Sequence, residues 1–241
     1  FPMELSVSEI QVDNKRMFIG LVRDITERKK IDKMKNEFIS TVSHELRTPL
    51  TSIQGSLELI LSGAMGEMPE DCMPLLDIAN NNSARLVRLI NDILDIEKIE
   101  SGKMEFTVKP VEIMAIVKES INANKAYGDE YGVQFVITSQ VPDCFVMADS
   151  DRLIQVLTNL LSNAAKFSLQ EKTVEIGVAL VKNNLRVSVT DYGSGIPDEF
   201  RERIFNKFSQ ADASSTKQQG GTGLGLSICK AIIEKLGGQI D

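Results

Sequence analysis

The chain has 241 residues, of which 42% are hydrophobic and 25% are charged, and its formal net charge is −7. This balance is typical of a globular protein and excludes collagen-like, disulfide-rich and wholly disordered chains. The acidic charge and the absence of a Lys/Arg run argue against a nucleic-acid-binding protein, whose phosphate contacts need a concentrated basic surface.

The cysteines and the single histidine exclude several kinds of site. Cys72, Cys144 and Cys229 are far apart and form no CxxC pair, so we predict neither a disulfide framework nor a zinc site, and a reducing cytoplasm fits best. His44 is the only histidine, which excludes metal sites built from several histidines. No apolar run approaches the roughly 18 residues that span a bilayer. The chain begins with Phe1, and we expect it to be an internal piece with a sensor or membrane segment upstream.

The first elements are a strand hairpin and a long helix. Apolar residues alternate over residues 3–10 and again over 17–22, which predicts two paired strands. From Thr26 the apolar residues recur every three or four positions, which predicts one amphipathic helix ending at Ser62 and Gly63. Pro49 lies inside this helix and should kink it near Glu45.

A second helical series runs from Leu75 to Ile96 and closes at residues 100–102. Its apolar steps alternate between three and four, as in the seam of a helical bundle. Two helices with one apolar stripe each cannot enclose a core alone. We therefore predict that two chains pair their helical hairpins into a four-helix bundle, which makes the protein a homodimer.

The remainder mixes helix and strand patterns and predicts a separate α/β domain. The fold class is α+β, a helical hairpin followed by an α/β sandwich. The expected elements are a strand at 104–108, a helix at 111–127, a strand at 133–138, a helix at 150–166, strands at 173–181 and 185–190, and a helix at 223–236.

A candidate nucleophile lies in the first helix. His44 is two positions from both Val42 and Leu46, about 200° around the helix, so it should face solvent. Glu45 is adjacent and Thr48 is one turn further on. An exposed imidazole beside a carboxylate can act as a nucleophile, although the same pattern alone is more typical of an inert surface histidine.

Two glycine-rich segments predict a nucleotide site. Residues 191–195 follow a strand, and residues 220–226 precede a helix, where oriented N–H groups attract phosphate. Each could instead be a plain flexible turn. The connection at 196–220 is long for a compact domain and resembles a mobile lid, in which Phe205 and Phe208 could be packing anchors.

A polar stripe on the helix at 150–166 is the third candidate. Gln155, Asn159, Asn163 and Lys166 recur at steps of four, four and three. Amide oxygens ending in a lysine suit a magnesium triphosphate, because Mg²⁺ prefers oxygen ligands and keeps waters. The alternative is an ordinary polar helix face.

Together, five segments resemble the H, N, G1, F and G2 boxes of sensor histidine kinases in the order of that family. They are residues 43–49, 159–166, 191–195, 205–208 and 221–226. The resemblance covers about residues 27–241, and the segment ending at Arg28 is similar to the last strands and exit linker of a PAS sensor domain. It implies a PAS-like end at 1–26, a dimerisation and histidine phosphotransfer hairpin at 27–101 and an ATP-binding catalytic domain at 102–241.

The resemblance also implies roles in the phosphotransfer hairpin. His44 would accept the γ-phosphoryl group of ATP, and Glu45 would act as base on the far ring nitrogen. Thr48 would orient water that removes phosphate from a response regulator. The implied partners are a second copy of the chain, the receiver domain of a response regulator and an upstream PAS domain, in a cytoplasmic location.

In the catalytic domain the resemblance implies a complete ATP site. Asn163 would hold Mg²⁺ with help from Asn159, Lys166 would contact phosphate, and Asp191 would accept from the adenine amino group. The glycines that would shape the adenine pocket and meet the phosphates are Gly193, Gly195, Gly221, Gly223 and Gly225.

Two departures and two rival functions accompany this prediction. Gln210 stands where many members carry a lid arginine, so Lys207 or Lys217 would have to supply that cation. The chain stops at Asp241, where the family continues into two more strands, so we expect a truncated sheet. A gyrase-like or mismatch-repair-like ATPase is disfavoured, because those enzymes resemble each other in carrying a glutamate where this chain has Asn159. The other rival is a scaffold whose bundle only dimerises.

Overall fold

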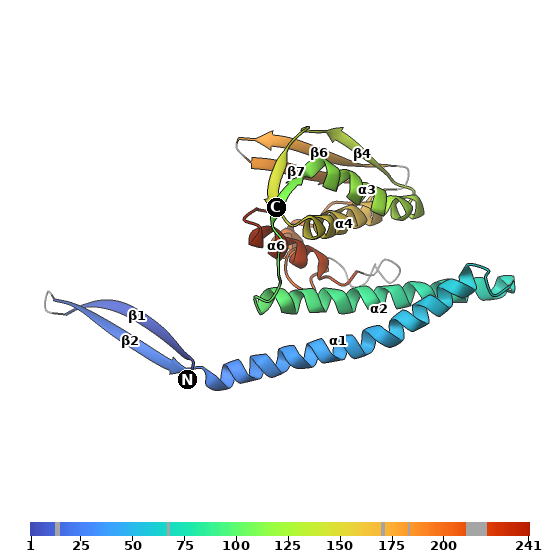
Figure 1. Ribbon diagram of the computed structural model, residues 1–241. Coiled ribbons are helices and arrows are strands. Elements are labelled where there is room, and N and C mark those ends of the chain that lie inside the picture. Colours follow the sequence, from blue (N-terminus) through green and yellow to red (C-terminus); the bar gives the residue numbers. More distant parts are fainter. Residues whose placement is uncertain (13–14, 67, 170–171, 183, 211–220) are drawn as a thin grey trace. The chain divides into compact units, whose positions relative to one another are not determined.

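A computed structural model describes residues 1–12, 15–66, 68–169, 172–182, 184–210 and 221–241. The chain divides into two compact units, Phe1–Glu97 and Lys98–Asp241, and Figure 1 labels most of their helices and strands.

The first unit begins with the predicted hairpin. β1 (Met3–Val12) pairs antiparallel with β2 (Lys15–Asp24), and both strands are longer than their alternating patterns indicated. Asp24 ends the second strand, where its carboxylate accepts hydrogen bonds from the backbone N and Oγ1 of Thr26 at 2.8 and 2.6 Å. These bonds lower the pKa of Asp24 and place a hydrogen-bonded turn at the start of the first helix.

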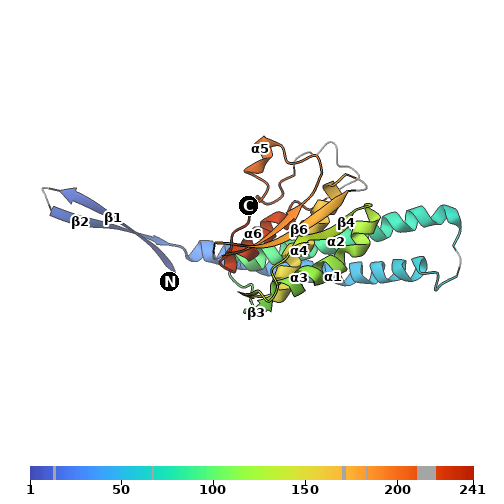
Figure 2. The ribbon, with the colours of Figure 1, turned by 90° about the horizontal axis from the view of Figure 1, so that it is seen from above.

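Two long helices make up the rest of this unit, and only the last three residues of the second helix belong to the second unit. They are α1 (Thr26–Leu61) and α2 (Met73–Glu100), the latter preceded by the short 3₁₀ helix η1 (Glu70–Cys72), and Figure 2 shows them returning on each other as a hairpin. α1 continues without a break through Pro49, although the carbonyl of Glu45 cannot accept the usual hydrogen bond from a proline nitrogen.

The hairpin does not enclose a core of its own, as predicted. Only four of its described residues are buried, namely Ser43, Ser83, Ile90 and Ile96. Large apolar side chains with exposed fractions of 45–69% line both helices: Ile31, Met34, Phe38, Leu46, Ile53, Leu59, Leu75, Ile78 and Leu86. A single chain therefore leaves an apolar surface without a partner.

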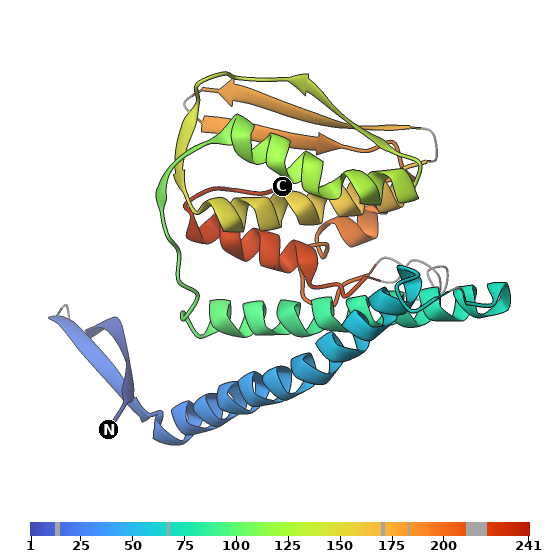
Figure 3. The same cartoon turned by 45° about the vertical axis from the view of Figure 1, so that its right-hand side comes forward.

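The second unit is a two-layer α/β domain. Its elements are β3 (Lys109–Glu112), α3 (Ile113–Glu130), β4 (Gln134–Ser139), β5 (Phe145–Ala148), α4 (Ser150–Phe167), β6 (Thr173–Val181), β7 (Asn184–Thr190), α5 (Asp198–Arg201) and α6 (Gly225–Lys235). A three-stranded sheet has the order β4-β6-β7, with β4 parallel and β7 antiparallel to β6. Figure 3 shows α3 and α4 on one face of this sheet and α6 beside α4.

One strand was predicted at the wrong place and another was missed. Residues 104–108 form no strand. The strand here is β3, which follows them, has four residues and pairs with β5, a strand that was not predicted. Val111 lies opposite Val146 in this pair, and the helix expected from residue 111 therefore starts at Ile113. Each of the two short strands depends on a partner distant in sequence, so neither has a clear local pattern.

The core lies between the helices and the sheet. Val117 of α3, Leu161 of α4 and Ile176 of β6 each expose 2% or less of their surface. α4 starts at a side-chain cap, since Oδ1 of Asp149 accepts from the backbone N of Asp151 at 3.0 Å and of Arg152 at 3.1 Å. Oδ2 of the same carboxylate accepts from the backbone N of Thr107 at 2.7 Å. Burial acts to raise the pKa of Asp149, but these donors and Arg152 outweigh it and lower the pKa below its usual value.

Candidate functional site

The polar stripe on α4 lies partly buried beside the start of α6. Asn159 packs so tightly against Gly225 that a β carbon there would overlap the amide oxygen and lie 2.6 Å from Nδ2. Asn163 and Lys166 are likewise half-buried. The structure therefore brings the N-box amides to the helix end that the glycine-rich segment forms.

Lys166 lies against the same segment. Its Nζ is 4.6 Å from the centre of the Phe167 ring, and a β carbon on Gly221 would lie 3.6 Å from that nitrogen. The Nε2 atom of Gln210 donates to the carbonyl of Gly221 at 2.9 Å. Gln210, which stands where a lid arginine was expected, thus holds the backbone of the glycine-rich segment.

Two lysines, Lys207 and Lys217, were considered as replacements for the lid arginine. Lys207 forms an ion pair with Glu100, and Lys217 lies outside the described residues. The predicted lid contains the short helix α5, and its residues 211–220 also lie outside the described part of the chain.

One glycine at the start of α6 is required by backbone geometry. Gly223 has φ +70°, and a β carbon there would lie 2.9 Å from the carbonyl carbon of Phe208. Leu224 caps the helix without a side-chain hydrogen bond, while its own N–H donates to Thr222 Oγ1 at 3.2 Å. The first N–H groups of an 11-residue helix are a favourable place for an anion.

The segment after β7 is joined to the end of α4. Gly193 forms an isolated antiparallel bridge with Ser168, and its N–H donates to Asp191 Oδ1 at 2.9 Å. Gly195 has φ +74°, a conformation that favours glycine. Asp191, Gly193 and Lys166 therefore come together around the same end of α4.

Tyr192 makes a contact that the sequence did not indicate. Its hydroxyl donates to Glu175 Oε1 at 2.8 Å, and this hydrogen bond raises the pKa of Tyr192. Glu175 lies on β6, whereas Tyr192 follows the end of β7, 17 residues further along the chain, so no local pattern could have found the pair.

His44 is exposed on α1, as its helical position predicted. The side chains of His44 and Glu45 expose 75% and 77% of their surface, and Nδ1 of the imidazole lies 3.8 Å from Glu45 Oε1. Thr48 Oγ1 donates to the carbonyl of His44 at 3.4 Å. These three residues belong to the first unit, whereas the nucleotide-site candidates belong to the second.

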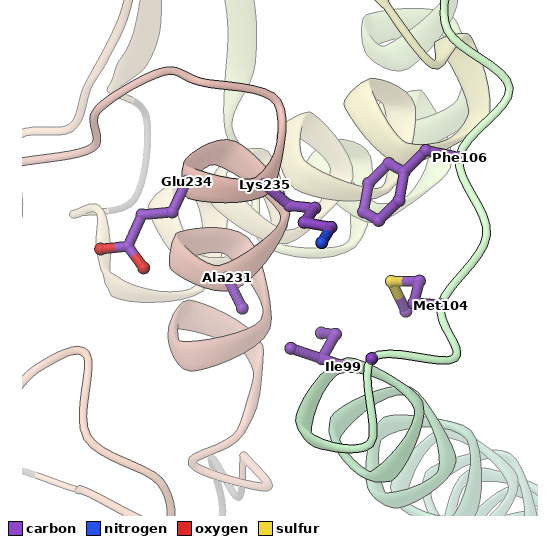
Figure 4. Close-up of a pocket in the computed structure, with 7 residues that line it drawn as sticks. Ile99, Met104, Phe106, Ala231, Glu234 and Lys235 are labelled. Atoms are coloured by element: carbon purple, nitrogen blue, oxygen red, sulfur yellow. The ribbon is translucent and has the colours of Figure 1, made fainter. Parts of the chain in front are cut away.

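A cavity of about 300 Å³ in the second unit is separate from these groups. Figure 4 shows the side chains of Ile99, Met104, Phe106 and Ala231 around it, with Lys235 reaching toward it and Glu234 pointing away. It shares no residue with the candidate nucleotide site. The candidate nucleotide site is therefore identified by the chemistry of its glycines, its amides and Lys166, and not by this cavity.

The donor set fits Mg²⁺ bound together with a nucleotide. Within the described ranges no three His, Cys, Asp or Glu side chains cluster as a metal site. Mg²⁺ at phosphates takes only one or two protein oxygens and keeps waters, so an all-protein cage is not needed. The amide oxygens of Asn163 and Asn159 are suitable ligands of this kind.

Comparison with known families agrees with this arrangement. Residues 34–102 match the His Kinase A (phospho-acceptor) domain, and residues 148–241 match the histidine kinase-, DNA gyrase B- and HSP90-like ATPase domain. The chain belongs to the sensor histidine kinase family. The phospho-acceptor match contains His44 and the ATPase match contains every nucleotide-site candidate, which confirms the family and the fold class predicted from the motifs.

Individual relatives are also histidine kinases. The chain is 35% identical to the sensor histidine kinase WalK of Bacillus subtilis (strain 168), over 99% of this chain and 39% of that protein. It is 38% identical to the circadian input-output histidine kinase CikA of Synechococcus elongatus, over 86% of this chain and 28% of that protein. The chain thus spans well under half the length of these relatives.

Solved histidine kinase structures resemble the chain as well. The crystal structure of full-length ShkA in complex with AMPPNP has a TM-score of 0.66 at 28% identity, covering 83% of this chain and 41% of ShkA. The Acinetobacter baumannii histidine kinase AdeS has a TM-score of 0.57 at 27% identity, covering 82% of this chain and 89% of AdeS. Among the described residues of this chain, no helix is both long and apolar enough to cross a membrane.

Proposed function

We propose that this chain is the kinase core of a sensor histidine kinase, which transfers the γ-phosphoryl group of ATP to His44 and then to an aspartate of a response-regulator receiver domain. The observation that carries the proposal is the exposed imidazole of His44 with the Glu45 carboxylate on its Nδ1 side. The phospho-acceptor and ATPase domains, present in one chain in that order, support it.

The geometry of His44 supports different roles for its two ring nitrogens. Because Glu45 lies toward Nδ1, Nε2 is the nitrogen left to attack phosphorus. A bond forms between Nε2 and the γ-phosphorus, and the bond to the bridging oxygen of the β-phosphate breaks, so that ADP leaves with that electron pair. The ring becomes positively charged, and a small rotation of the exposed Glu45 side chain lets it accept the Nδ1 proton.

The second unit would bind the nucleotide. Asp191 would accept from the adenine amino group in a pocket shaped by Gly193 and Gly195, both held near the end of α4. The AMPPNP complex of the similar ShkA structure supports an ATP-type ligand. The segment after β7 would therefore form the wall of the pocket that binds the adenine ring.

The phosphates would lie at the start of α6. Lys166 and the helix N–H groups would neutralise their charge, and Gly221, Gly223 and Gly225 would allow close backbone approach. Asn163 and Asn159 would hold Mg²⁺, which when bound neutralises charge on the phosphates.

The partners of this core are proposed as well. The exposed apolar residues of α1 and α2 support a homodimer in which two hairpins form a four-helix bundle. An upstream PAS domain would continue the β1–β2 hairpin, whose apolar residues are also exposed. Thr48, one turn from His44, would orient the water that dephosphorylates the response regulator.

Incubation with Mg²⁺ and γ-labelled ATP tests the kinase function. We expect acid-labile, alkali-stable label on the wild-type chain and none on His44→Gln, while both bind ADP equally. Glu58→Gln, an exposed change on the same helix, serves as the matched control and should keep its label. ATP binding without label would overturn the proposal. Release of free phosphate with no labelled protein would indicate the ATPase alternative.

A further inference from the structure

Arg47 and Asn91 connect the two long helices close to the phospho-acceptor candidate. Nη2 of Arg47 on α1 donates to Oδ1 of Asn91 on α2 at 2.7 Å, across 44 positions in sequence. Arg47 follows His44 by three positions, and side chains with this spacing are neighbours on a helix surface. The contact therefore holds the turn of α1 that carries His44 against α2.

This turn lacks a backbone hydrogen bond. Pro49 has no N–H, so the carbonyl of Glu45 receives no helical donor from that position. A helix is easiest to bend where this ladder is interrupted. The position of His44 then depends more on side-chain contacts with α2 than it would in an uninterrupted helix.

Two described contacts from α2 support the weakened turn. Besides the Arg47 contact, Ser83 Oγ donates to the carbonyl of Leu50 at 3.4 Å. The Arg47 bond is shorter and carries a full charge on its donor, which makes it the stronger of the two. The ion pair of Lys35 with Glu97 at 3.4 Å lies several turns away and cannot act locally on His44.

We propose that Asn91, acting through Arg47, is a positioning residue for phosphoryl transfer at His44. The pair holds the interrupted turn of α1 against α2, so the imidazole meets the phosphoryl donor in one orientation. Displacement of a reacting group by about 1 Å can lower a rate by about 10²-fold. The inference rests on the proposed kinase function and adds to it a residue on the opposite helix.

The test compares autophosphorylation kinetics of the full chain and three variants of α2. Asn91→Leu has similar size and no acceptor, and we expect its kcat to fall about tenfold with KM for ATP unchanged, because nucleotide binding belongs to the other unit. Asn91→Asp keeps the acceptor oxygen and should retain at least half of the wild-type kcat. Asn81→Leu, at an exposed asparagine of the same helix, is the matched control and should behave as wild type.

The outcomes separate this inference from the function on which it rests. Equal kcat in Asn91→Leu and wild type would overturn the inference and leave the kinase function intact, as would equal losses in the Leu and Asp variants. Absence of label on the wild type would overturn both. If circular dichroism and gel filtration show that Asn91→Leu is misfolded, the contact is tested from the α1 side instead. This test uses a second substitution, Arg47→Met, because Met keeps an unbranched apolar stem but has no donor for Asn91 Oδ1, and an unchanged kcat in Arg47→Met would refute the positioning role.

Discussion

Gly193 faces the carbonyl oxygen of Phe167 so closely that a β carbon on Gly193 would overlap that oxygen. The same β carbon would lie 2.9 Å from Asp191 Oδ1. This contact joins the segment after β7 to the last turn of α4, where Lys166 lies. The close packing of Gly193 thus connects the residues proposed to bind adenine with Lys166, which is proposed to bind phosphate.

Gly193→Ala should therefore weaken nucleotide binding and stability together. Relief of the overlap must move the Phe167 backbone, and overpacking of this kind costs about 1–3 kcal/mol. We expect at least a tenfold higher Kd for a fluorescent ADP analogue and a lower Tm. Gly221→Ala is the control for stability, because its β carbon would meet Lys166 Nζ at an ordinary 3.6 Å. Wild-type Kd and Tm in Gly193→Ala would contradict the prediction.

Gly225→Ala should lower the free energy of unfolding, and the size of this loss should depend on whether Asn159 is present. The added methyl group would collide with the Asn159 amide, so the variant should lose about 1–3 kcal/mol in urea unfolding. In an Asn159→Ala background the colliding amide is absent, and the cost of Gly225→Ala should fall by about 1 kcal/mol or more. Strict additivity of the two changes would show that the residues do not touch.

Asp149 should make the stability of the second unit depend on acidic pH. Its pKa is lowered in the folded state, so its contribution is complete above the unfolded value of about 3.9 and is lost as pH falls through the folded value. Urea unfolding between pH 7 and pH 3 should show a smaller loss for Asp149→Asn than for wild type. At pH 7, Asp149→Ala should cost about 1–2 kcal/mol through the lost cap. Parallel pH profiles for wild type and Asp149→Asn would contradict this assignment.

Glu45→Gln should slow phosphorylation of His44 without affecting ATP binding. The amide keeps the size of the side chain but cannot take the Nδ1 proton, and loss of a general base typically costs about 10²–10⁴-fold. Single-turnover labelling gives the rate, and ADP affinity gives the control. Glu27→Gln, another exposed glutamate of α1, should label at the wild-type rate. A wild-type rate for Glu45→Gln would remove Glu45 from the reaction.

The long elements were predictable because each carries its own repeating pattern. α1, α2 and α4 follow apolar steps of three and four residues, and the ends of α4 differ from the prediction by a single residue, Phe167. β3 and β5 were not predictable, because each has four residues and exists by pairing with the other. Their stability comes from a partner that the local sequence does not reveal.

The sequence alone determines the types of chemical group in the candidate site: one imidazole beside a carboxylate, a series of amides ending in a lysine, and glycines before a helix. These are visible because motif chemistry depends on short spacing along the chain. The tertiary structure decided which distant groups meet, among them Gly193 with Phe167, Gly225 with Asn159, and Arg47 with Asn91. Such contacts depend on how helices and strands pack, which is set by the whole core and not by any one segment.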